Sequence, residues 1–68
     1  MRLVKDIRTG EEVIVSLEGI DEYSAVGDGT ILKQYGKDLK VLASSPGETM
    51  ISLQHKWKVT HITIKISG

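Results

Sequence analysis

Hydrophobic and polar residues alternate along several short stretches of the chain. Within residues 11–20, Val13, Val15 and Leu17 occupy every second position, and Ser16 lies between two of them. Side chains of a β-strand point alternately to its two faces, so this period of two predicts a strand with one buried face.

Glycine-rich segments separate the predicted strands. Thr9-Gly10-Glu11 and Val26-Gly27-Asp28-Gly29-Thr30 predict turns, because glycine adopts backbone angles that other residues avoid. The apolar spacing of residues 30–35 fits either one helical turn or a strand. Gly29 and Gly36 on either side leave too little length for a stable helix, so we expect a strand.

Two further alternating stretches flank Ser44-Ser45-Pro46-Gly47-Glu48. The first is residues 39–43, and the second is residues 50–59, with Trp57 on its predicted buried face. Pro and Gly at the second and third positions suit a type II turn. The pattern therefore predicts a β-hairpin.

The apolar face of the chain changes after Val59. Before this residue the apolar positions are odd-numbered, as at Leu53, and after it they are even-numbered, as at Ile64. A slip of one residue turns every side chain to the other face, so we expect a bulge, a bend or a single helical turn between Trp57 and His61.

Five short strands with polar turns, without a long helical stretch or a repeat, predict an all-β protein that forms a small barrel, closed or partly open, or a pair of packed sheets. At 68 residues the chain is expected to form a single domain, residues 1–68. The expected core residues share the inward-facing phase of the strands. They are Val13, Val15, Leu17, Leu39, Val41, Ile51, Leu53, Ile62 and Ile64.

Composition narrows the classes of function. The chain is 40% hydrophobic and 26% charged with zero formal net charge, which is typical of a globular protein. It has no cysteine, which excludes a disulfide framework, a thiolate zinc site and a cysteine nucleophile. No apolar run approaches the roughly 18 residues of a membrane span, and charges in residues 1–6 do not fit a signal peptide, so we expect a cytoplasmic protein that is not inserted in a membrane.

Candidate catalytic and metal-binding residues do not group in the sequence. On one unbroken strand His55 and His61 would lie about 20 Å apart, and only a tight turn between them would bring both to one ion. Adjacent acids such as Asp21 and Glu22 point to opposite faces of a strand and cannot jointly flank a bond. We therefore expect no enzyme activity, no cofactor and no metal site.

Charge is unevenly distributed along the chain. Residues 1–28 hold three bases and seven acids, whereas residues 29–68 hold six lysines and two acids. Lysines with an exposed aromatic ring can bind a nucleic acid strand or another partner. The candidate partner-binding residues are Lys33, Tyr35, Lys40, Lys56, Trp57 and Lys58. The alternative, favoured because the chain has no Phe, is that Trp57 fills the core and the lysines protect strand edges from aggregation.

The segment from Leu3 to Val15, with Asp6-Ile7 and Gly10-Glu11, resembles the start of the ferrous iron transport protein A (FeoA) family, whose members often begin with a leucine-led "L-x-D-L-x-x-G-E" segment. Residues 32–36 resemble the end of that family's helix. Residues 39–42, 45–47 and 50–53 resemble its central hairpin. The resemblance implies an SH3-like barrel that binds a protein partner in ferrous iron uptake, such as the cytoplasmic domain of a membrane transporter, or a related barrel of the kind fused to metal-dependent regulators.

We therefore expect a non-enzymatic protein-interaction module whose strand edges pair with a partner, with a nucleic-acid-binding barrel as the alternative. Residues 61–66 are rich in β-branched side chains, and their apolar and polar positions alternate strictly. Lys65 is their only charged residue when His61 is neutral. Such a segment is well suited to pair with another chain unless the first strand covers it. This pairing predicts a homodimer or a larger homo-oligomer.

Overall fold

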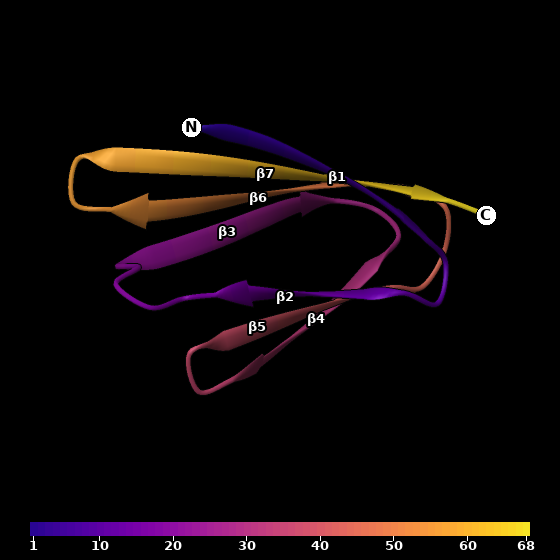
Figure 1. The fold of residues 1–68 in the computed structure, drawn as a ribbon, viewed down its shortest axis with the longest axis horizontal. Coiled ribbons are helices and arrows are strands. Elements are labelled where there is room, and N and C mark those ends of the chain that lie inside the picture. Colours follow the sequence, from indigo (N-terminus) through magenta and orange to yellow (C-terminus); the bar gives the residue numbers. More distant parts are fainter.

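The computed structural model describes all 68 residues, which form seven β-strands and their connections, without a helix. The strands are β1 (Arg2–Arg8), β2 (Glu12–Ser16), β3 (Glu22–Gly27), β4 (Thr30–Tyr35), β5 (Asp38–Ala43), β6 (Gly47–His55) and β7 (Lys58–Ser67). They form a four-stranded sheet, β1-β7-β6-β3, and a three-stranded sheet, β2-β5-β4, which lie one over the other (Figure 1). The all-β prediction is confirmed, but the chain has seven strands and neither sheet closes into a barrel. The structure contains no helix that could span a membrane.

The core lies between the two sheets, on the inward-facing positions of the strands. Its buried apolar residues are Ile7, Val15, Leu17, Leu39, Val41, Ala43, Ile51, Leu53, Ile64 and Ile66. Of the predicted core residues, only Val13 and Ile62 are half-buried rather than buried. The buried hydroxyl of Thr49 lies 2.9 Å from the Thr30 hydroxyl and donates to Asp28 O at 3.1 Å, so this polar side chain is fully paired.

The final strand is covered on both sides within the chain. β1 pairs with β7 in parallel, from Arg2 opposite His61 to Arg8 opposite Ser67, and β6 pairs with the other side of β7. Residues 61–66 therefore offer no free edge to a second chain, and the expectation of self-pairing there is wrong. The free edges belong instead to β1 and β3 in the four-stranded sheet and to β2 and β4 in the three-stranded sheet.

The segment Ser44–Gly47 connects the two sheets rather than two paired strands. It leads from β5 in the three-stranded sheet to β6 in the four-stranded sheet, so the predicted hairpin is wrong. Gly47 also lacks the positive φ that a type II turn requires at its third position. A Pro-Gly pair marks a change of direction, but it does not determine which strand the chain pairs with next.

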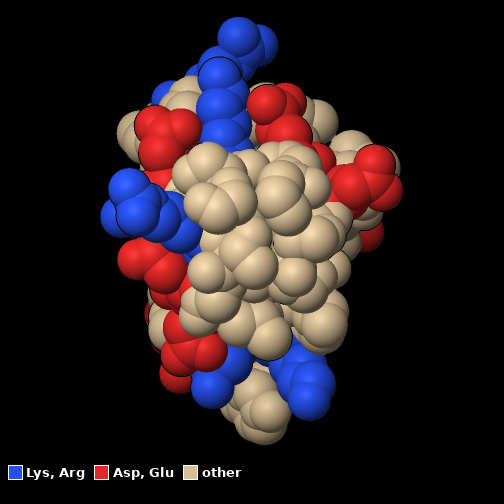
Figure 2. Space-filling view, turned by 90° about the vertical axis from the view of Figure 1, so that its right-hand side faces the viewer, with Lys and Arg blue, Asp and Glu red and all other residues tan.

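Two connections between the sheets pack against each other at one end of the molecule. Asp28 N donates to Glu48 O at 3.0 Å, and Ser44 N donates to Gly29 O at 2.8 Å. A Cβ atom at Gly27 would lie 2.2 Å from Glu48 O, so only glycine permits this approach. The turn predicted over Val26–Thr30 is confirmed at its centre, where residues 28 and 29 connect β3 to β4. Seen from this end, uncharged residues form the centre and charged side chains lie around them (Figure 2).

A tight turn at residues 56–57 joins β6 to β7 and produces the change of apolar face. His55 lies opposite Lys58, and Lys56 adopts a φ of +53° in the turn. The chain thus reverses slightly earlier than predicted. Because Trp57 lies at the tip of this hairpin and not within a strand, it cannot reach the space between the sheets. Its side chain is 95% exposed, which corrects the expectation that it fills the core.

Candidate interaction surfaces

The structure divides the predicted partner-binding residues between two surfaces. Lys33, Tyr35 and Lys40 lie on β4 and β5, whereas Lys56, Trp57 and Lys58 form the tip of the β6–β7 hairpin, which belongs to the other sheet. The charge distribution along the sequence had placed all six in one lysine-rich half. They do not form one continuous basic stripe on a single sheet.

The first surface is the exposed face of the three-stranded sheet. Lys40 Nζ lies 5.6 Å from the centre of the Tyr35 ring and 3.8 Å from Glu12 Oε2. Lys33 lies directly opposite Lys40 in the β4–β5 register. With Ile31 and Leu42 nearby, these side chains line a hollow of about 230 Å³. Glu12 neutralises part of the positive charge on this face.

The second surface is the tip of the β6–β7 hairpin. Lys56 N donates to Asp21 Oδ2 at 2.7 Å, and a ring nitrogen of His55 hydrogen-bonds to Gly19 O. These contacts fix the hairpin to the connection between β2 and β3, which carries acidic residues. The indole of Trp57 has no such contact and extends into solvent.

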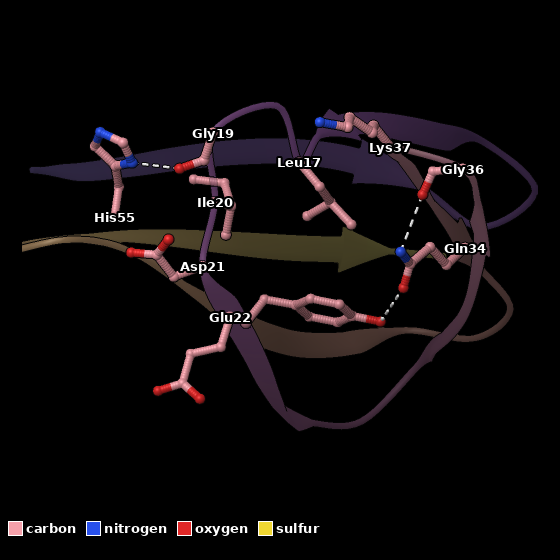
Figure 3. Close-up of a pocket in the computed structure, with 10 residues that line it drawn as sticks. Leu17, Gly19, Ile20, Asp21, Glu22, Gln34, Gly36, Lys37 and His55 are labelled. Atoms are coloured by element: carbon pink, nitrogen blue, oxygen red, sulfur yellow. Dashed lines mark hydrogen bonds between the residues drawn. The ribbon is translucent and has the colours of Figure 1, made fainter.

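A hollow of about 770 Å³ opens beside this hairpin, and we call it the hairpin-end hollow (Figure 3). Its residues come from both sheets and from the β2–β3 connection, and they include Leu17, Ile20, Asp21, Tyr23, Gln34 and His55. The Tyr23 hydroxyl donates to Gln34 Oε1 at 3.3 Å and so connects the edge strands of the two sheets. Sequence reasoning missed this hollow because its residues lie far apart in the chain.

A third concavity lies between β1 and β2, and we call it the β1–β2 groove. It has a volume of about 480 Å³. Its apolar lining includes Leu3, Val4, Val13, Ile14, Leu53 and Ile62. Lys5 is its only charged lining residue. One feature of the sequence could have drawn attention to it: Val13-Ile14-Val15 is apolar on both faces of its strand, and Ile14 remains 52% exposed.

Both strands that border this groove have one unpaired edge, since β1 pairs only with β7 and β2 only with β5. Leu17 N donates to Lys37 O at 2.6 Å, and Val15 lies opposite Leu39. In an antiparallel ladder hydrogen-bonded pairs recur at every second residue. The main-chain groups of Val15 therefore face β5, and those of Ile14 face the open edge.

The two histidines lie in different places. His55 contacts Gly19, whereas His61 Nδ1 lies 3.0 Å from Ser52 Oγ between β6 and β7. The tight turn at 56–57 therefore does not bring the imidazoles to one site. The structure contains no group of three or more side chains placed to hold a metal ion.

No protein-family model, curated protein or solved structure matches the chain. The resemblance of residues 3–15 to the FeoA family therefore stays a prediction from the sequence.

Proposed function

We propose that this chain is a protein-interaction module that binds an extended segment of a partner protein in the β1–β2 groove. The observation that carries this proposal is an apolar groove bordered by two unpaired strand edges. A partner segment that adds to such an edge gains main-chain hydrogen bonds, and its alternate side chains fill the groove.

The edge of β2 is the better docking edge of the two. On β1, Arg2, Asp6 and Arg8 accompany the unpaired edge, and Lys5 lines the groove. Charged residues of this kind protect an edge from pairing with another chain. β2 has its exposed Ile14 at the middle of the strand, so it is less protected.

Lys5 determines the charge that the partner segment should carry. It is the only charged residue that lines the groove, and its neighbours there are mostly apolar. A carboxylate of the partner would pair with this ammonium group, and opposite charges across an interface improve specificity. The expected ligand is therefore an extended segment with apolar residues at every second position and one acidic residue.

Selection from a phage-displayed library of random peptides tests the proposal. Wild-type protein should enrich sequences with alternating apolar residues and an acidic residue. Ile14→Pro removes an N–H that faces the open edge, so it should abolish this enrichment while the sheet stays intact. Peptides that bind both proteins equally well would overturn the assignment to β2.

Nucleic-acid binding is the second candidate, favoured by the exposed indole of Trp57 between Lys56 and Lys58. Exposed aromatic rings stack on bases, and lysines contact phosphates. Asp21 contacts the main chain beside these lysines, and Glu12 contacts Lys40, so the positive charge is partly neutralised. Binding of a single-stranded oligonucleotide that weakens steeply with salt, with a smaller slope in a Lys56→Gln, Lys58→Gln variant, would favour this candidate.

The cellular setting of the module rests on the sequence resemblance alone. If residues 3–15 mark a FeoA-like chain, the module is an accessory or regulatory component of ferrous iron transport. Its fold would then be related to the SH3-like barrel. Its partner would then be the cytoplasmic domain of a membrane transporter. Recovery of such a transporter with the wild-type protein, but not with Ile14→Pro, would test this setting.

A further inference from the structure

Trp57 presents nearly its whole indole to solvent, at the tip of a two-residue turn. Tryptophan carries more apolar surface than almost any other side chain and is strongly enriched among residues that dominate protein interfaces. No contact within the chain explains its position. We infer that Trp57 inserts into the hairpin-end hollow of a second copy of this chain, and that the second copy returns the same contact.

The hollow suits a flat aromatic ring. Leu17 and Ile20 supply apolar surface and point into it (Figure 3), and Tyr23 adds an aromatic ring to its lining. Its volume of about 770 Å³ leaves room for a complete indole. The chain's own Trp57 does not occupy it, because that side chain is 95% exposed.

The hollow is held open before any partner arrives. The His55 ring is hydrogen-bonded to Gly19 O, Lys56 N donates to Asp21 Oδ2, and the Tyr23 hydroxyl donates to Gln34. These contacts join the hairpin, the β2–β3 connection and β4 around the hollow. A preformed site requires little ordering of side chains on binding, which lowers the cost of association.

Charge complementarity identifies a second copy as the occupant. Lys56 and Lys58 flank Trp57, and Asp21 and Glu22 line the hollow at the same end of the molecule. Lys37 is the only lysine in the lining, and its Nζ lies 3.7 Å from Glu18 Oε2. When the indole of one copy enters the other, its two lysines approach two carboxylates. A two-fold axis repeats this contact, which closes the assembly as a dimer. A nucleic acid or an anionic surface would instead meet these same carboxylates.

The single tryptophan makes the inference directly measurable, because Trp57 is the only source of tryptophan fluorescence. Sedimentation equilibrium from 1 μM to 1 mM should show a monomer–dimer equilibrium. The emission maximum should move to shorter wavelength as the dimer forms. A chain that stays monomeric up to 1 mM would overturn the inference.

Variants locate the contact. Trp57→Ala should weaken dimerisation at least about tenfold, whereas Tyr35→Ala, which removes another exposed aromatic ring, should leave it unchanged. Glu22→Lys and Lys58→Glu should each weaken the dimer, and the two changes in one chain should restore it. A dimer that persists in Trp57→Ala would place the contact elsewhere and overturn the inference. Ile14→Pro should not affect the dimer, which separates this test from that of the β1–β2 groove.

Discussion

Ile51 and Ile62 lie directly opposite each other on β6 and β7, yet Ile51 is completely buried and Ile62 is only partly buried. The difference arises because Ile62 lines the β1–β2 groove, where the two sheets lose contact. The core is therefore well packed beneath β6 and becomes incomplete towards β1.

This difference predicts unequal effects of truncation. Ile51→Ala should reduce the free energy of unfolding by about 2–5 kcal/mol, because it removes a fully enclosed side chain. Ile62→Ala, an identical change of chemistry, should cost less by at least about 1 kcal/mol. Urea unfolding of both variants measures the difference. Equal midpoints would show that the groove is closed in solution.

The packed connections predict that two glycines respond very differently to alanine. Gly27→Ala places a Cβ atom 2.2 Å from Glu48 O, so it should cost at least about 3 kcal/mol or prevent folding. Gly36→Ala meets no atom within 4 Å and only has to adopt a φ of +60°, which should cost about 1–2 kcal/mol. Thermal unfolding followed by circular dichroism compares them. A tolerated Gly27→Ala would contradict the close approach.

The exposed indole predicts little effect of Trp57→Ala on folding. In dilute solution, where only monomer is present, the free energy of unfolding should change by less than about 0.5 kcal/mol. Acrylamide should also quench the wild-type fluorescence as efficiently as that of free tryptophan derivatives. Inefficient quenching of the monomer would show that the indole of Trp57 is buried.

Lys5, the only charged residue that lines the β1–β2 groove, predicts a preference for acidic peptides that a charge reversal should invert. Lys5→Glu should shift peptide selection from acidic to basic sequences while the alternating apolar positions stay the same. Lys65→Glu, a matched change on the neighbouring strand outside the groove, should leave the selected sequences unaltered. If wild type and Lys5→Glu select the same acidic peptides, Lys5 does not contact the bound peptide.

Alternation of apolar residues was sufficient to predict the strand class and most of the core. Leu39, Val41 and Ile51 are completely buried because inward positions recur at every second residue whatever the topology. Alternation does not specify which strands pair, so the connection at Ser44–Gly47 was interpreted as a hairpin. β1 was missed as a strand because charged residues interrupt its pattern, and parallel pairing with β7 is what holds it.

Trp57 shows the same limit at the level of a single residue. It continues the odd-numbered series of Ile51 and Leu53, so its position in the sequence predicted burial. The reversal at Lys56 carries none of the Asn-Gly or Asp-Gly signals of a two-residue turn. The β1–β2 groove was hidden for a related reason, since its apolar residues become neighbours only when the two sheets are assembled.

The pairing of β1 with β7 also determines when the chain can fold. Thr9 N donates to Ser67 O at 2.9 Å, so β1 is synthesised well before the strand with which it pairs. Contacts between such distant segments slow folding, because a long loop must close before they contribute. Until β7 has been synthesised, β1 and the edge of β6 that pairs with β7 remain unpaired, and such edges can pair with other nascent chains.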